Sequence, residues 1–261
     1  MKSRSFAFDP VAAGRPLRVA AFMSGSGSNI RRLLERGSSA YEVAFIFSDR
    51  ADGLCQGEKI AHEYGLPYFS YDVRRFHALR GLPRTPASPA GRAARRAYDQ
   101  VARRLVRSFG VDLIALGGYM SYLTLPRGVN VHPADLSLAD ARGKRRFVGD
   151  DAVLDAIAAG QAELRASTLW IDRGVDTGPL LLVSDPLPVE LPAPLPALLA
   201  DPPRLRQVAD QHQERLKELG DWAIFPLTIE LMAQGRLTIA PLGVAVLDGR
   251  PRPAGVRIAE L

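Results

Sequence analysis

The sequence contains few of the residues that form disulfides or bind metal ions. Cys55 is the only cysteine among 261 residues, so an intrachain disulfide cannot form. The 4 histidines are not grouped with cysteine or carboxylate residues at the spacing of a metal site. The sequence therefore predicts no metal ion, and its single cysteine favours a reducing compartment, for which we expect the cytoplasm.

Long apolar runs are also missing. No stretch of about 18 apolar residues is present, so the sequence predicts no membrane-spanning helix. Residues 1–16 are mixed and polar, unlike the apolar core of a signal peptide, and we expect them to form a loose leader. Hydrophobic residues make up 47% of the sequence, which is enough for a sizeable core, and we expect residues 17–261 to form a single domain.

Aromatic residues are sparse, at 7% of the sequence, and basic residues outnumber acidic ones. The formal net charge of +6 favours anionic partners in general: nucleotides, polyglutamylated cofactors or nucleic acid. Residues 74–107 carry ten arginines and one acid, Asp99, without the interleaved aromatic residues of a nucleic-acid groove. This segment is either a solvated basic face or a surface that steers an anionic ligand. The sequence does not favour nucleic acid as a partner, and it does not predict the oligomeric state.

What the sequence does contain is an alternation of apolar runs and helical patterns. Strands are predicted at residues 17–23, 42–47, 66–69, 111–116, 129–132, 167–172 and 180–183. Helices are predicted at residues 30–36, 53–64, 97–108, 150–159, 205–219 and 221–232. Residues 81–91 and 185–203, rich in proline, are predicted to be loops, and a hairpin is expected after Leu237. The alternation predicts an α/β fold with a parallel sheet, and we expect His62, His77 and His212 at the surface.

A glycine-rich turn, Ser24–Asn29, joins the first predicted strand to the first predicted helix. Backbone N–H groups at a helix N-terminus bind phosphate, and glycines allow close approach. The turn lacks the third glycine of the dinucleotide pattern and the Lys-Ser/Thr of a Walker loop. It is therefore either a phosphate site of another kind or only a turn with a helix cap.

Asn130 and His132 alternate with valines in the predicted strand 129–132 and therefore share a face. A side-chain amide can donate to a developing oxyanion, and histidine can carry a proton near neutral pH. Asp176 lies in a predicted tight turn that would hold its carboxylate in one place. The alternative is structural: the Asn and His would bond to loop backbone, and Asp176 would only form the turn.

Taken in order, these segments resemble the folate-dependent formyltransferase family. The segments that carry the resemblance are Ser24–Asn29, Phe47–Asp52, Arg95–Asp99, Gly117–Met120, Asn130–Pro133, Val175–Pro179, Ile224–Leu227 and Gly235–Leu237. The resemblance implies a Rossmann-like α/β fold, with a mainly parallel sheet and helices on both faces. It also implies that the chain transfers a formyl group from 10-formyltetrahydrofolate to the amine of glycinamide ribonucleotide in purine synthesis. These small molecules would be its partners, and no metal would be needed.

The resemblance also implies roles for individual residues. Asn130, His132 and Asp176 match the catalytic residues of the family. The N-terminal half of the chain would bind the nucleotide, and the C-terminal half would bind folate and carry out catalysis. The residues implied to bind the acceptor and its phosphate are Gly27, Ser28, Asn29 and Asp221, and those implied to bind folate are Arg95, Met120, Ser121, Tyr122, Leu123 and Asp172.

The residue types fit this chemistry. When the amine attacks the formyl carbon, the carbonyl oxygen becomes an oxyanion, and we expect Asn130 and a protonated His132 to stabilise it. We expect Asp176 to raise the pKa of His132, because a nearby opposite charge favours the charged form.

The chain departs from the family pattern in several places, and residues 81–91 and 185–203 look inserted. Ala134–Ser137 follows the His-Pro pair where the family continues with serine and a Leu-Pro segment, and Lys144–Phe147 is unusually basic. Ser121 stands where the family often has an arginine. Two alternatives therefore remain: a sister formyltransferase that acts on another amine, and a non-catalytic homologue that binds a nucleotide or folate.

Overall fold

The chain divides into two compact units. The computed structural model describes residues 5–261. The N-terminal unit contains Phe8–Asn130 and Met232–Gly235. The C-terminal unit contains Val131–Leu231, Arg236–Leu261 and the described residues before Phe8. The single domain expected over residues 17–261 stays a prediction.

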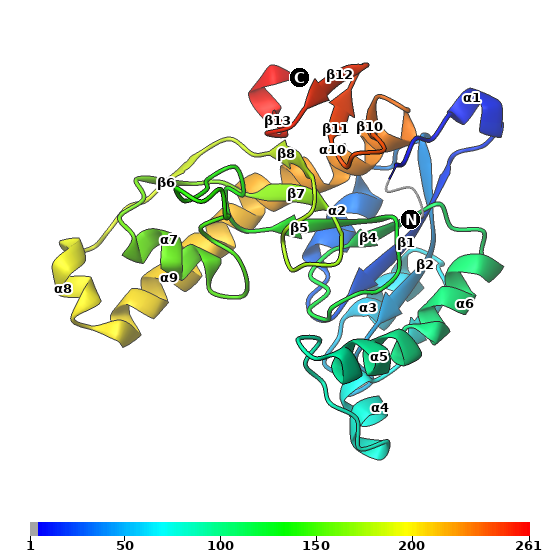
Figure 1. Ribbon diagram of the computed structural model, residues 1–261, viewed down its shortest axis with the longest axis horizontal. Coiled ribbons are helices and arrows are strands. Elements are labelled where there is room, and N and C mark those ends of the chain that lie inside the picture. Colours follow the sequence, from blue (N-terminus) through cyan, green and yellow to red (C-terminus); the bar gives the residue numbers. More distant parts are fainter. Residues whose placement is uncertain (1–4) are drawn as a thin grey trace. The chain divides into compact units, whose positions relative to one another are not determined.

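A parallel sheet forms the centre of the N-terminal unit (Figure 1). Its strands are β1 (Leu17–Met23), β2 (Tyr41–Ser48), β3 (Tyr68–Ser70), β4 (Leu113–Leu116) and the first part of β5 (Gly128–His132). They lie in the order β5-β4-β1-β2-β3, and each strand is parallel to its neighbours in that order. β1 is buried without a break from Val19 to Met23, as expected for a strand that is covered on both faces.

Helices cover both faces of this sheet. They are α2 (Ser28–Glu35), α3 (Gly57–Glu63), α4 (Val73–Leu79), α5 (Pro89–Tyr98) and α6 (Gln100–Ser108), whereas the short helix α1 (Pro10–Ala13) has no buried residue. The ring of Phe22 packs on Phe45, whose ring lies 5.0 Å from Phe109 at the end of α6. Met23 and Ile60 of α3 instead lie against Gly27 at the start of α2. Phe22 and Met23 are neighbours in β1, so their side chains point to opposite faces of the sheet. One face is therefore covered near α6 and the other by α2 and α3, which confirms the predicted helices on both faces.

The C-terminal unit continues from the last two residues of β5. Its strands β7 (Ser167–Trp170), β8 (Leu180–Val183) and β13 (Val256–Arg257) lie in the order β13-β8-β7-β5. β7 and β8 are antiparallel, whereas β8 and β13 are parallel, so the sheet is mainly but not wholly parallel. The predicted terminal hairpin is present as β10 (Leu237–Ile239) and β11 (Ala245–Leu247), and β12 (Arg250–Arg252) extends it to three strands.

The remaining elements of this unit are helices and a short ribbon. They are α7 (Ala152–Ala158), α8 (Leu195–Leu199), α9 (Pro202–Leu216), the π-helix η1 (Lys217–Asp221), α10 (Trp222–Ala233), the 3-10 helix η2 (Ile258–Glu260) and the strand pair β6 (Glu163–Leu164) with β9 (Leu187–Pro188). The last residues of α10 belong to the N-terminal unit.

Two predicted loops contain helices, which corrects the sequence analysis. α5 begins inside the predicted loop 81–91, because Ser88 caps it by accepting a hydrogen bond from the Gly91 amide at 3.0 Å, with Pro89 in its first turn. α8 lies inside the predicted loop 185–203. Proline is favourable in the first turn of a helix, where its missing N–H has no partner to lose. The segment 97–108, predicted as one helix, is the end of α5 and all of α6, which meet at Asp99.

Two histidines expected at the surface are buried instead. His77 is 2% exposed and His212 is 4% exposed. His212 pairs both ring nitrogens: Nδ1 lies 2.8 Å from the Val208 carbonyl, and Nε2 accepts from the Glu190 amide at 3.1 Å. His62 is exposed, as predicted.

The part of the predicted leader that the structure describes is ordered, so it is not loose. Phe6 exchanges backbone hydrogen bonds with Ile239, at 2.9 and 2.7 Å, and its ring lies 5.2 Å from Trp170. α1 begins at Pro10, and the carboxylate of the preceding Asp9 caps the helix. Residues 1–4 of the leader lie outside the described residues. Within residues 5–261, no helix has the length and apolar composition needed to cross a membrane.

Candidate active site

The candidate catalytic residues begin in β5. Val129 and Val131 are buried, and Asn130 and His132 alternate with them on the other face of the strand. The Ala134 amide donates to the His132 carbonyl at 2.9 Å, so the chain turns directly after Pro133. The strand therefore ends as the sequence predicts, with the imidazole at its C-terminal end.

His132 and Asp176 face each other within the C-terminal unit. His132 Nδ1 lies 3.7 Å from Asp176 Oδ2, and the imidazole is only 7% exposed. His132 Nε2 lies 3.3 Å from the Phe147 carbonyl oxygen. Asp176 Oδ2 also accepts a hydrogen bond from the Gly149 amide at 3.1 Å. The structure thus brings together two of the three predicted catalytic side chains.

The pKa of His132 is lower than its ordinary value, which corrects the expected direction. Burial is the largest cause, because it disfavours the charged imidazolium. Asp176 raises the pKa as expected, and so does the Phe147 carbonyl, but the charge of Arg145 lowers it further. Burial therefore favours the neutral imidazole, which can accept a proton during a reaction.

Backbone geometry fixes the turn that carries Asp176. Asp176 has a φ of 51°, in the left-handed region that is uncommon for a residue with a side chain. Asp172 Oδ1 accepts hydrogen bonds from the Gly174 amide at 2.8 Å and from Thr177 Oγ1 at 2.7 Å. A Cβ on Gly178 would lie 1.7 Å from the Trp170 carbonyl oxygen, so this position requires glycine. Asp172, which was predicted to bind folate, thus stabilises the turn through hydrogen bonds to two residues of that turn.

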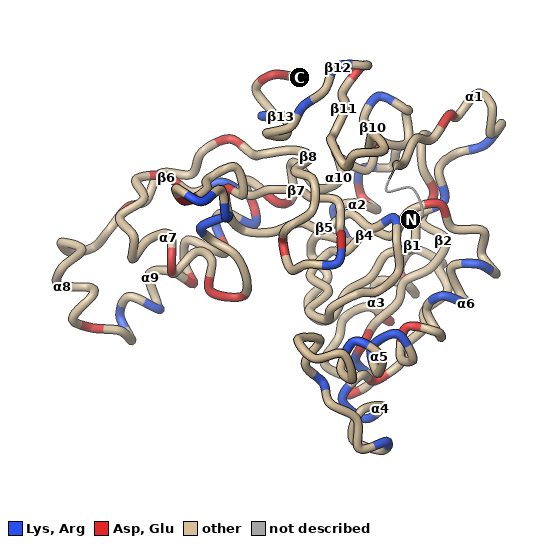
Figure 2. The backbone as a smooth tube through the Cα atoms, viewed as in Figure 1, with Lys and Arg blue, Asp and Glu red and all other residues tan. Residues whose placement is uncertain are grey.

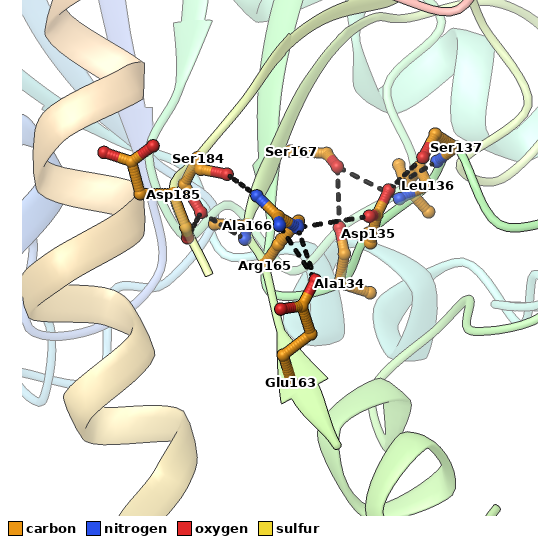
Figure 3. A network of polar contacts seen from close by, with 10 residues as sticks. All are labelled: Ala134, Asp135, Leu136, Ser137, Glu163, Arg165, Ala166, Ser167, Ser184 and Asp185. Carbon is orange, nitrogen blue, oxygen red and sulfur yellow. Dashed lines mark hydrogen bonds and ion pairs between the residues drawn. The ribbon is translucent and has the colours of Figure 1, made fainter. Parts of the chain in front are cut away.

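Ser167 holds the chain that follows the candidate catalytic histidine (Figure 3). Its side chain is fully buried in β7. Ser167 Oγ donates to the Ala134 carbonyl at 2.7 Å and accepts from the Leu136 amide at 3.0 Å. One hydroxyl therefore satisfies two buried backbone groups in the segment where this sequence departs from the family pattern.

Arg165 adds a second support to the same segment (Figure 3). Its Nε lies 3.8 Å from Asp135 Oδ2, and its Nη1 donates to the Ser184 carbonyl at 3.0 Å. Glu163 accepts from Arg165 Nη2 at 2.8 Å. Asp135 Oδ1 in turn accepts from the Ser137 amide at 2.9 Å. The segment after His132 is thus anchored to β7 and to the residue after β8.

The predicted phosphate-binding residues lie at the start of α2 in the N-terminal unit. Gly27 is the N-cap residue with a φ of 69°, and it has no side chain with which to cap the helix. Ser28 and Asn29 follow as the first two helical residues. Their amides therefore belong to the first turn, where N–H groups lack partners within the helix. This is the backbone arrangement that an anion requires.

Asp49 connects this glycine turn to the predicted folate segment. Ser24 Oγ donates to Asp49 Oδ1 at 2.6 Å and accepts from the Met120 amide at 2.9 Å. Ser121 Oγ donates to Asp49 Oδ2. The serine found where the family often has an arginine is therefore bound to a buried carboxylate. Met120 itself is 69% exposed.

Arg95 is buried inside the N-terminal unit. It is 4% exposed, and its Nε lies 3.1 Å from Asp99 Oδ1. Its Nη2 donates to the Tyr119 hydroxyl at 2.9 Å, and Asp99 Oδ2 accepts from the Thr124 amide and hydroxyl, both at 2.7 Å. The pair thus fixes both ends of the predicted folate segment, which includes half-buried Tyr122 and buried Leu123. The predicted contact between Arg95 and folate stays a prediction.

The other arginines of residues 74–107 lie in α4, α5 and α6, except Arg80 and Arg84, which lie between α4 and α5 (Figure 2). Arg92 Nη1 donates to the carbonyls of Pro86 and Ala87, and the Arg80 guanidinium lies 4.3 Å from the centre of the Phe76 ring. Both interpretations of this basic segment remain predictions.

Asp221, the last predicted acceptor-binding residue, lies in the C-terminal unit. It is 5% exposed and ends the π-helix η1. Single π-turns within helices are frequently found at functional sites. Nothing in the sequence predicted this turn. Within residues 5–261, no group of three or more histidine, cysteine or carboxylate side chains could hold a metal ion.

The sequence and fold were compared with known proteins. Residues 17–189 match the protein family described as formyl transferase. The chain belongs to the formyl transferase family. The match confirms the family that the sequence motifs predicted.

Several relatives of this formyl transferase carry more specific names. Phosphoribosylglycinamide formyltransferase from Haemophilus influenzae is 24% identical over 246 residues, which cover 90% of this chain and 96% of that protein. The enzyme of the same name from Mycobacterium tuberculosis is 28% identical over 186 residues, 69% of this chain and 74% of that one. Trifunctional purine biosynthetic protein adenosine-3 from Drosophila melanogaster is 26% identical over 239 residues. This chain spans only 15% of that much longer relative, although 87% of this chain is matched.

Solved structures show the same fold. Phosphoribosylglycinamide formyltransferase from Coxiella burnetii superposes with a TM-score of 0.64 at 22% identity, covering 93% of this chain and 99% of that one. Glycinamide ribonucleotide transformylase 1 from Symbiobacterium toebii gives a TM-score of 0.62 at 25% identity, covering 92% and 95%. The predicted α/β fold with a mainly parallel sheet is confirmed.

Proposed function

We propose that this protein transfers a formyl group from 10-formyltetrahydrofolate to the amine of glycinamide ribonucleotide, a step of purine synthesis. The observation that carries the proposal is the buried His132–Asp176 pair at the end of β5, two residues beyond Asn130, in a chain of the formyl transferase family. The names of the relatives support the choice of acceptor.

The residues supply the steps that this reaction needs. The acceptor amine attacks the formyl carbon, a C–N bond forms, and the carbonyl electrons move to oxygen. The Asn130 amide donates to that oxyanion, and removing one such donor typically costs about 10²–10³ in rate. Neutral His132 accepts the proton that the amine loses and delivers it to folate N10 as the old C–N bond breaks. Asp176 stabilises the imidazolium while it exists.

This assignment revises one part of the sequence-based mechanism. The sequence predicts a His132 that is protonated before the reaction, whereas burial in the structure lowers the pKa of this histidine. A neutral histidine is the better base, and it can still act as the acid once it has taken the proton of the amine. The same residue therefore serves both steps.

The proposal assigns the acceptor and its phosphate to Gly27, Ser28, Asn29 and Asp221. It assigns the folate to Met120, Ser121, Tyr122, Leu123 and Asp172, with Arg95 in the same group. The position of Gly27, Ser28 and Asn29 at the N-terminus of α2 and the exposure of Met120 support these assignments.

We further propose that the protein works in the cytoplasm with small molecules as its partners. Its single cysteine supports a reducing compartment, and the purine-synthesis names of its relatives support soluble substrates. No nucleic-acid partner is proposed, because aromatic residues are sparse among the arginines of residues 74–107.

A second acceptor is favoured by one observation. Ala134–Ser137 and the basic Lys144–Phe147 replace the sequence that the family usually has near the acceptor. A sister formyltransferase would act on a different amine with the same catalytic residues. A non-catalytic homologue would bind a ligand and transfer nothing.

Purified protein incubated with both substrates tests these alternatives. Formylated glycinamide ribonucleotide is the expected product, and His132→Ala should abolish its formation while leaving the circular dichroism spectrum unchanged. Transfer only to another amine would favour the sister enzyme. Binding of both substrates without any transfer would favour the non-catalytic homologue.

A further inference from the structure

A small hairpin in the C-terminal unit carries Arg145, a residue with no role in the mechanism above. Ala139 and Arg145 form an isolated antiparallel bridge, and the Asp140 amide donates to the Lys144 carbonyl at 2.8 Å. The Asp140 carboxylate accepts from the Lys144 amide at 2.9 Å. These bonds fix the backbone of Arg145 from within the hairpin.

The Arg145 guanidinium bridges two carbonyl groups of the turn that carries Asp176. Its Nη2 donates to the Gly178 carbonyl at 2.8 Å, and its Nη1 donates to the Asp176 carbonyl. The same loop reaches the carboxylate itself, because the Gly149 amide donates to Asp176 Oδ2. Three hydrogen bonds thus connect this loop to one turn.

The turn needs an external support. Asp176 adopts a left-handed φ of 51°, which is unfavourable for a residue with a Cβ. Asp176 Oδ2 lies 3.7 Å from His132 Nδ1, just outside hydrogen-bond distance. No hydrogen bond between these two side chains holds the carboxylate in place, so a small rotation of the turn would move it away from the imidazole.

We propose that Arg145 is a positioning residue for formyl transfer, which binds the carbonyls of Asp176 and Gly178 so that the Asp176 carboxylate faces His132. The proposal rests on the proposed function. An arginine suits this role because its planar fork presents two parallel donors, whereas a lysine ammonium is a single point of charge. This role would explain one basic residue of the segment Lys144–Phe147, which departs from the family pattern.

A role through charge alone makes a different prediction. The charged groups that influence His132 are Asp176 and Asp150, which raise its pKa, and Arg145, which lowers it. Burial lowers the pKa of Arg145, and the charges of Asp176 and Asp172 raise it. Lysine keeps the charge and loses the fork, so Arg145→Lys separates position from charge.

The test measures the His132 titration and the rate in matched variants. The pKa of the His132 imidazole is followed by NMR, with His132→Asn used to assign its signal, so this readout does not need an active enzyme. Formyl transfer gives kcat and KM for both substrates. Arg142→Gln is the control, because Arg142 lies in the same hairpin and its side chain is exposed.

In Arg145→Lys, we expect the pKa of His132 to fall, because Asp176 drifts away and no longer raises it. We expect kcat to fall on the order of tenfold or more, as for the loss of a charge-assisted hydrogen bond, with both KM values nearly unchanged. Arg142→Gln should match the wild type in both readouts. An Arg145→Lys variant that behaves as the wild type in both titration and rate would overturn the proposal.

Two further measurements keep the result from being mistaken for unfolding. In an Asp176→Asn background, Arg145→Lys should add little, because the residue acts through Asp176; additive effects would contradict this. Added guanidinium chloride at low concentration should partly restore kcat in Arg145→Ala and should not do so in His132→Ala. If the wild type transfers no formyl group, the proposed function fails, whereas the NMR titration still decides whether Arg145 positions Asp176.

Discussion

Replacing Ser167 with alanine should destabilise the C-terminal unit far more than the loss of one hydroxyl usually does. Ser167 is fully buried, and its Oγ bonds to both the Ala134 carbonyl and the Leu136 amide. Ala134 and Leu136 are each 3% exposed, so water cannot replace the missing hydroxyl. The variant leaves one acceptor and one donor buried without a partner.

The magnitude follows from these two groups. Each buried polar group left unpaired costs about 1–3 kcal/mol, so the loss of partners for two groups should lower the free energy of unfolding by roughly 2–6 kcal/mol. For a protein of this size, 1 kcal/mol shifts Tm by about 2–4 °C, which predicts a loss of roughly 4–24 °C. Formyl transfer should fall as well, because the segment that follows His132 loses its anchor.

Urea unfolding followed by tryptophan fluorescence is the suitable assay. Both tryptophans, Trp170 and Trp222, lie in the C-terminal unit, so their emission reports on the unit that is perturbed. Ser137→Ala is the matched control, since its half-buried hydroxyl donates only to the nearby Asp135 carboxylate. A loss below about 1 kcal/mol, or one equal to that of Ser137→Ala, would refute the reasoning.

Three further predictions concern pH, phosphate and the turn. Activity should be lost as pH falls through the pKa of His132, because the neutral base disappears. Asp176→Asn should move this acidic limb of the pH–rate profile to lower pH and lower the maximal rate. An unmoved limb would mean that Asp176 only forms the turn. A phosphate-free glycinamide riboside should bind at least roughly tenfold more weakly than the ribonucleotide, as measured by calorimetry. Ser28→Pro should weaken binding of the ribonucleotide in the same way and leave folate binding unchanged. Equal affinities for the two acceptors would mean that the glycine turn is structural only. Gly178→Ala should lower Tm and expression strongly, since its Cβ would meet the Trp170 carbonyl oxygen at 1.7 Å, and a wild-type Tm would show that the turn can shift.

The elements predicted best from the sequence were those whose signal is local. The apolar run of β1, the alternation in β5 and the glycine turn before α2 each depend on neighbouring residues, and each was placed correctly. α5 was missed because proline and glycine were taken as breakers, although a proline in the first turn helps a helix begin.

The features that could not be predicted depend on contacts distant in sequence. The burial of His212 depends on Glu190, 22 residues away, and the lowered pKa of His132 depends on burial that no local pattern reveals. Arg145 and Ser167 act through residues about 30 positions away. The signal available for Arg145 was its place in a basic segment that departs from the family pattern.

Transfer of an isotopically labelled formyl carbon tests directly whether this protein formylates glycinamide ribonucleotide. The purified protein is incubated with labelled 10-formyltetrahydrofolate and glycinamide ribonucleotide, and the product is identified by mass spectrometry. We expect the label on the glycinamide amine with the wild type and with Arg142→Gln, and no label there with His132→Ala. Unlabelled acceptor with folded, substrate-binding wild-type protein, or equal labelling by His132→Ala, would contradict this expectation.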